Sequence, residues 1–157
     1  MKITIIAVGK TATSYIQNGI DTYMKRLRHY LPVELVIIPD IKQTRALTSA
    51  EQKVREGMAM LQMLQPGDRV VLLDERGVEL SSRDFSERLS KRMNQGLRRL
   101  VFIVGGPYGF SDEVYTRADS QLSLSKMTFT HEMVRLFFVE QVYRAMTILA
   151  GEPYHHD

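Results

Sequence analysis

Glycines cluster directly after an apolar run, an arrangement that lets a polypeptide backbone approach a bound molecule closely. Residues 100–104 are apolar, and Gly105, Gly106, Pro107, Tyr108 and Gly109 follow them. This spacing does not fit the dinucleotide-binding pattern G-x-G-x-x-G, and the proline removes one backbone donor from any phosphate cradle. We therefore expect a ligand-binding loop that is not of the dinucleotide type.

Two further segments stand where a ligand of an open α/β sheet normally binds. Leu73 ends an apolar run, at what would be the carboxyl end of a strand. The second segment comprises Leu124, Ser125, Lys126, Met127, Thr128 and Phe129. Backbone polar groups beside apolar side chains suit an adenine ring with a flexible polar tail, although each segment alone is more often a plain turn.

The ionisable candidates lie near the C-terminus. His131 and Arg135 have the four-residue spacing that places them on one helix face, whereas Arg144 follows Glu140 with the spacing of an ordinary helix ion pair. Residues 154–157 read Tyr-His-His-Asp, and two histidines without a further ligand are poor evidence for a metal. We expect no metal site, and no Ser-His-Asp or paired-carboxylate spacing is recognisable.

The composition excludes several classes of protein. The 157 residues contain no cysteine, which rules out thiol nucleophiles and cysteine-ligated metals. No apolar run reaches the roughly 18 residues that a membrane helix needs, so we expect a soluble, cytoplasmic protein without a membrane partner. The net charge is +3 and the positive excess lies before residue 100, which favours a polyanionic partner; solvated helix faces explain it about equally well.

The hydrophobic pattern alternates strands with helices, as in an α/β fold with a mostly parallel sheet and helices on both faces. The length indicates a single domain, residues 1–157. Ser14, Thr48, Ser81 and Ser111 are the expected helix caps. The expected strands cover 2–8, 33–38, 69–74, 100–104 and 121–124, with a polar loop at 40–47 and a turn at 75–77; the expected helices cover 14–27, 48–64, 81–94, 111–118 and 131–149.

The last of these helices is apolar on nearly every side. One face of a sheet cannot cover such a helix completely in a chain of this size. We therefore expect it to form a subunit interface, most simply in a two-fold homodimer. The alternative is a central core helix within a monomer.

Taken in order along the whole chain, these segments resemble the SPOUT (α/β-knot) superfamily, and within it the bacterial pseudouridine methyltransferases of 23S rRNA. The segments that carry the resemblance are the N-terminal MKITIIAVGK, VGGPYG at 104–109, LSLSKMTF at 122–129, His131 with Arg135, EQVYRA at 140–145 and PYH at 153–155. Each is weak alone, and their joint order is specific.

The resemblance implies a deep C-terminal trefoil knot, with knot and cofactor region at roughly 70–157, and an obligate homodimer. It implies methyl transfer from S-adenosyl-L-methionine to N3 of a pseudouridine in the helix 69 loop of 23S rRNA in the assembled ribosome. Carried over by position, cofactor binding falls on Leu73, Gly105, Gly106 and residues 124–129. Arg144, Tyr154 and His155 match residues implicated in RNA binding and activity, and we expect Arg144 and His155 to assist loss of the N3 proton.

Two rivals remain at this stage. A non-catalytic RNA-binding or assembly factor would use the same basic face and need no cofactor. A Rossmann-type methyltransferase with a small substrate would be a monomer without a knot.

Overall fold

The computed structural model describes residues 1–41 and 47–157 and confirms the α/β class. In chain order the elements are β1 (Lys2–Val8), α1 (Ser14–Leu27), β2 (Val33–Ile38), α2 (Ser49–Gln62), β3 (Arg69–Glu79), α3 (Ser82–Asn94), β4 (Arg99–Val104), α4 (Asp112–Arg117), β5 (Ser120–Ser123) and α5 (His131–Leu149). The five strands form one sheet in the order β2-β1-β4-β3-β5, and all neighbouring pairs are parallel. The middle of the expected loop at 40–47 lies outside the described residues.

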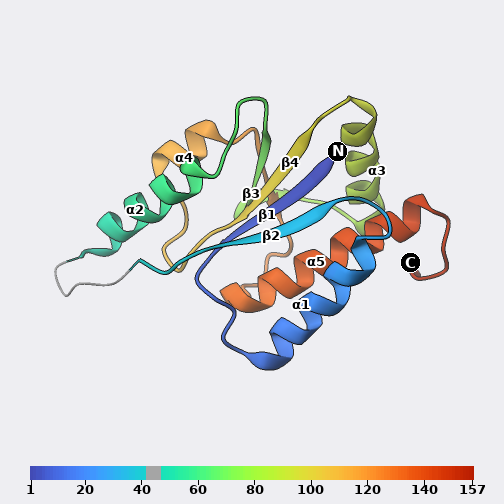
Figure 1. Ribbon diagram of the computed structural model, residues 1–157, viewed down its shortest axis with the longest axis horizontal. Helices are drawn as coiled ribbons and strands as arrows, with labels where there is room; N and C mark the ends of the chain where they lie inside the picture. Colours follow the sequence, from blue (N-terminus) through green and yellow to red (C-terminus); the bar gives the residue numbers. More distant parts are fainter. Residues whose placement is uncertain (42–46) are drawn as a thin grey trace.

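Helices cover both faces of the sheet, as expected (Figure 1). One face packs on α1, α3 and α5, and the other face packs on α2 and α4. Because both faces are covered, the strands are apolar in nearly continuous runs rather than in alternation. Each helix in the described ranges is too short or too polar to span a bilayer.

Three of the expected helix caps are confirmed. The hydroxyls of Thr48, Ser81 and Ser111 each accept a hydrogen bond from the backbone N–H three residues later. The cap at Ser14 is wrong, because the helix begins there and Thr13 precedes it. Thr13 donates its backbone N–H and its hydroxyl to the carboxylate of Glu132, so α1 begins at a contact with α5.

The turn expected at 75–77 is also wrong, because β3 continues to Glu79. Its register against β5 shifts between Leu73 and Val78, which both pair with Leu122. Gly77 lies in this bulge directly against the backbone of β5, where a Cβ atom would stand 2.6 Å from atoms of Gln121 and Leu122. β3 and β5 thus approach each other at Gly77 without room for a side chain. The trefoil knot itself stays a prediction.

α5 is covered within the chain to a greater extent than the sequence indicates. It packs against α1 and α3 as well as the sheet, and Phe138 is completely buried among Phe85 and Phe102. Phe137 and Leu149 remain 39% and 41% exposed. The central position of α5 therefore explains only the side that carries its fully buried residues, and the homodimer stays a prediction.

Candidate cofactor site

A pocket of about 560 Å³ opens at the carboxyl ends of β3, β4 and β5. Three segments far apart in the sequence form its walls, and the start of α5 closes it with His131 and Val134. Almost all of the residues expected to bind a cofactor line it: Leu73, Gly105, Gly106, Leu124, Ser125, Met127, Thr128 and Phe129. Lys126 does not line it and is exposed.

The glycine loop needs glycine for two different reasons. Gly109 has a φ of +79°, and its N–H donates to the carbonyl of Gly106 at 3.1 Å. At Gly106 the reason is space, because a Cβ atom would stand 2.3 and 2.9 Å from the two carboxylate oxygens of Glu56. The loop is therefore a tight turn that lies between the pocket and a buried side chain of α2.

The segment after β5 is held by short-range bonds. Ser123 donates its hydroxyl to the carbonyl of Ser125, and the Ser125 hydroxyl accepts the N–H of Met127 at 2.9 Å. The ring of Phe129 packs 5.0 Å from that of Phe137, centroid to centroid. Polar and apolar residues of this segment, Leu124, Ser125, Met127, Thr128 and Phe129, thus line the pocket together.

Three polar residues of the pocket wall were missed by the sequence reasoning. Tyr115 of α4 donates a short hydrogen bond to Asp74, and the Arg76 guanidinium donates to the Tyr115 hydroxyl at 2.7 Å. Burial and the bond to Asp74 raise the pKa of Tyr115. This contact fixes the bulge of β3 to α4, and no local sequence signal connects positions 41 residues apart.

His131 and Arg135 have different surroundings although they share a helix face. His131 is exposed at the pocket, whereas Arg135 is 1% exposed. The Arg135 guanidinium donates to the carbonyls of Val8 and Gly9, both at 2.7 Å, and to the Thr11 hydroxyl at 2.9 Å. Arg135 thereby ties the end of β1 to α5 and does not reach the pocket.

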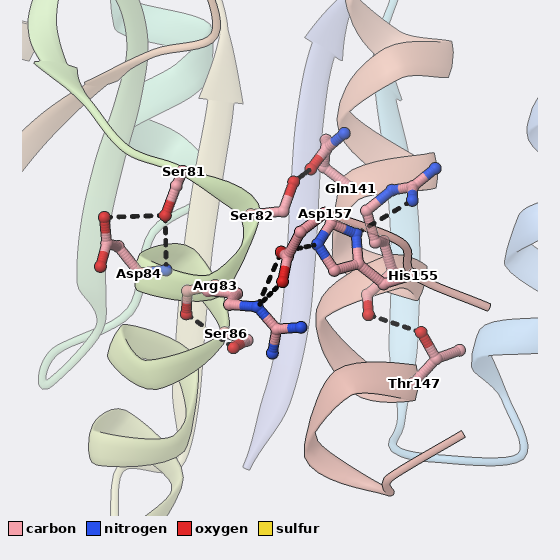
Figure 2. Close-up of polar contacts among 10 residues, drawn as sticks. Ser81, Ser82, Arg83, Asp84, Ser86, Gln141, Thr147, His155 and Asp157 are labelled. Atoms are coloured by element: carbon pink, nitrogen blue, oxygen red, sulfur yellow. Dashed lines mark hydrogen bonds and ion pairs between the residues drawn. The ribbon is translucent and has the colours of Figure 1, made fainter. Parts of the chain in front are cut away.

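The expected catalytic residues form a separate cluster, which we call the tail cluster: Arg144, Tyr154 and His155. The expected ion pair of Arg144 with Glu140 is present. The Arg144 guanidinium also donates to Nδ1 of His155 at 3.1 Å and lies 4.9 Å from the centroid of the Tyr154 ring. Asp157, to which the sequence assigned no role, accepts from His155 Nε2 at 3.0 Å and from Arg83 of α3 at 2.8 Å (Figure 2).

These contacts decide the protonation of the tail cluster. Arginine has no acceptor, so Nδ1 of His155 is the unprotonated nitrogen and Nε2 carries the proton that faces Asp157. Burial, with the bonds to Tyr23 and Glu140, raises the pKa of Tyr154, so its phenol is neutral at physiological pH. The basic lone pair of His155 is thus engaged by Arg144.

The tail cluster and the pocket lie at opposite ends of α5. His131 and Arg144 are separated by 13 residues, about 20 Å at 1.5 Å per residue. Within one chain the expected catalytic residues therefore do not meet the expected cofactor residues. Among the residues that the structure describes, no cluster of His, Asp and Glu could hold a metal ion.

Comparison with known proteins now decides the family. A family model described as "Predicted SPOUT methyltransferase" matches residues 1–155. The chain belongs to the SPOUT methyltransferase family. It is similar to the proteins named "Ribosomal RNA large subunit methyltransferase H" from Parabacteroides distasonis, at 55% identity over 100% of both chains, and from Christiangramia forsetii, at 56% over 99% of both.

A solved structure supports the fold of this SPOUT methyltransferase. The chain resembles "a probable methylase family protein from Haemophilus influenzae Rd KW20" with a TM-score of 0.53 and 9% identity. The match covers 95% of this chain and 66% of the other. At this identity the likeness concerns the fold alone.

Proposed function

We propose that the protein methylates 23S rRNA in the assembled ribosome, in the bacterial cytoplasm, with S-adenosyl-L-methionine as methyl donor and N3 of a pseudouridine in the helix 69 loop as acceptor. One observation carries the proposal: the residues that the family resemblance assigns to the cofactor, all but Lys126, line a single pocket at the carboxyl edge of the sheet. Relatives that match the full length bear the name of a large-subunit rRNA methyltransferase.

The pocket residues fit this cofactor. Gly105 and Gly106 leave the backbone bare where a flat ring could lie, and Leu73 and Leu124 supply apolar contact. The backbone of residues 124–129 offers polar groups for the ribose and the amino-acid tail. When bound, S-adenosyl-L-methionine supplies an electrophilic methyl group, so the protein must hold the acceptor nitrogen in line with it.

The protein must also assist removal of the proton from N3 of the pseudouridine. A cation stabilises the deprotonated ring, which is the role of Arg144, and an imidazole accepts the proton, which is the role of His155. His155 takes this role only after exchange of its partner, because its Nδ1 lone pair faces Arg144. Tyr154, neutral and beside Arg144, is suited to stack on a base of single-stranded RNA.

A homodimer solves the separation of about 20 Å along α5. A two-fold axis across α5 makes the two copies antiparallel, so that the end of one helix meets the start of the other. The tail cluster of one subunit then faces the pocket of its partner. The exposed Phe137 lies on α5 between the two sites and is suited to this interface.

The dimer is tested by Phe137→Glu, with Met93→Glu as a matched control. Both residues are 39% exposed, and Met93 lies on α3, another helix on the same face of the sheet as α5. We expect Phe137→Glu to give folded monomers in analytical ultracentrifugation, whereas Met93→Glu stays dimeric. A dimer of unchanged affinity in Phe137→Glu contradicts this interface.

The activity is tested in a strain that lacks the gene. We expect its 23S rRNA to lack one methyl group, which the purified protein and S-adenosyl-L-methionine restore on assembled ribosomes. Removal of residues 154–157 should abolish methylation and leave calorimetric binding of the cofactor intact, because the tail does not line the pocket. A protein that binds ribosomes and gives no heat with S-adenosyl-L-methionine is an RNA-binding factor instead.

A further inference from the structure

Glu56 is a buried carboxylate without an evident structural purpose. It is 3% exposed on α2 and faces the glycine loop, on the side away from the pocket. The Gln52 amide donates a hydrogen bond to it at 3.3 Å, and no Lys, Arg or His within 1–41 and 47–157 forms an ion pair with it. Burial of a carboxylate without a cationic partner costs free energy, so its position in the structure needs a physical explanation.

The position of Glu56 defines that use. Both carboxylate oxygens lie within 3 Å of the Cβ position of Gly106, and Gly106 lines the pocket. Only the glycine backbone therefore separates the carboxylate from the ligand. A larger residue at 106 would displace the charge from the pocket wall.

The charges of the pocket wall itself nearly cancel. Lys53 and Arg76 are opposed by Asp74 and Glu75 among the lining residues. Glu56 lies behind the pocket wall, and its ionised carboxylate adds a negative charge that no positive charge of the wall offsets. Burial, and to a smaller extent the charge of Asp40, raise the pKa of Glu56, whereas the bond from Gln52 lowers it. A cation bound in the pocket favours the ionised carboxylate, so ionisation of Glu56 and binding of a cation support each other.

We propose that Glu56 is a positioning and selectivity residue that makes the pocket prefer a cationic sulfonium over a neutral thioether. The inference rests on the proposed function, since it assumes S-adenosyl-L-methionine as methyl donor. The donor carries a positive sulfur, and its product S-adenosyl-L-homocysteine does not. The negative potential behind Gly106 favours the donor and weakens retention of the product.

The expected size follows from electrostatics. One unit charge that acts over roughly 10 Å at an effective dielectric constant of about 20 changes the affinity for a cation by about tenfold. A neutral ligand of the same shape is almost unaffected. The ratio of the two affinities therefore isolates the charge from any change in packing.

The experiment is calorimetric titration of three ligands at constant salt: S-adenosyl-L-methionine, S-adenosyl-L-homocysteine and sinefungin, whose amine places a cation near the same position. The variant is Glu56→Gln, which keeps the shape and removes the charge. Glu56→Asp keeps the charge, and Glu87→Gln removes an exposed carboxylate from α3 on the other face of the sheet.

We expect Glu56→Gln to weaken both cationic ligands about tenfold and to leave the thioether within twofold, while Glu56→Asp and Glu87→Gln keep the wild-type ratio. Equal weakening of all three ligands, or of none, overturns the proposal. If Glu56→Gln does not fold, the affinities of the wild type decide. A wild type that binds S-adenosyl-L-homocysteine as tightly as S-adenosyl-L-methionine and sinefungin also overturns the proposal. A wild type that binds none of the three refutes the proposed function instead.

Discussion

Gly77→Ala is the substitution whose cost the structure defines most sharply. Gly77 lies where β3 packs closely against its neighbour β5, and a Cβ atom there would stand 2.6 Å from three backbone atoms of Gln121 and Leu122. Ordinary contact begins at 3.4 Å, so the two strands must separate by about 0.8 Å, the difference between these distances. Backbone in the middle of a ladder cannot turn aside as a side-chain end can.

The magnitude follows from two opposed effects. Overpacking costs about 1–3 kcal/mol, and the upper part of this range applies where backbone must move. Loss of glycine flexibility in the unfolded chain returns about 0.4–1 kcal/mol. We therefore expect Gly77→Ala to lose about 2 kcal/mol, or about 4–8 °C in Tm for a chain of this size.

Urea denaturation and thermal melting at one fixed protein concentration measure this loss. Gly19→Ala is the matched control, because its Cβ atom would meet Leu136 Cδ1 at 2.8 Å, which is the end of a flexible side chain. We expect the control to be near neutral, since alanine also favours its helix. A Gly77→Ala protein as stable as the control refutes the close approach of β3 to β5 at Gly77.

Three further predictions follow from single contacts. Hydrogen bonds from the start of α1 lower the pKa of Glu132 below its ordinary 4.5, so Glu132→Gln should be less stable than wild type at pH 7, and the gap should close as the pH falls below about 4.5 in urea titrations. Asp68→Ala should cost about 3 kcal/mol in the same assay, because it leaves Arg99 unpaired at 14% exposure; a loss under 1 kcal/mol would contradict this. Gly106→Ala should weaken binding of the neutral S-adenosyl-L-homocysteine at least tenfold in calorimetry, and Glu56→Ala in the same protein should restore part of it by removing the clash; simple additivity would exclude that cause.

The sequence predicted the fold and grouped most of the residues that line the pocket, because both depend on local signals. Apolar runs define the strands, and ligands of parallel sheets bind where strands end, which located Leu73, Gly105 and residues 124–129. Lys126 was included only because it stands within that segment, and its exposed side chain turned out to lie outside the pocket.

The residues that were missed depend on contacts between distant positions. Asp74 with Tyr115, and Glu56 with Gly106, are neighbours only because β3, α2 and α4 meet at one edge of the sheet. The bulge of β3 was read as a turn because Glu75, Arg76 and Gly77 are polar or small, as turn residues are. Pairing with β5, which follows some 40 residues later, overrides that local preference.

The bonds of Arg135 have a consequence for how the protein is made. β1 is synthesised first and lies inside the sheet, yet its carboxyl end is completed by a guanidinium near the end of the chain. A growing chain therefore carries carbonyls at Val8 and Gly9 without this donor until α5 has been translated. Contacts of such sequence separation form slowly, so closure of the end of β1 by Arg135 should be a late step of folding.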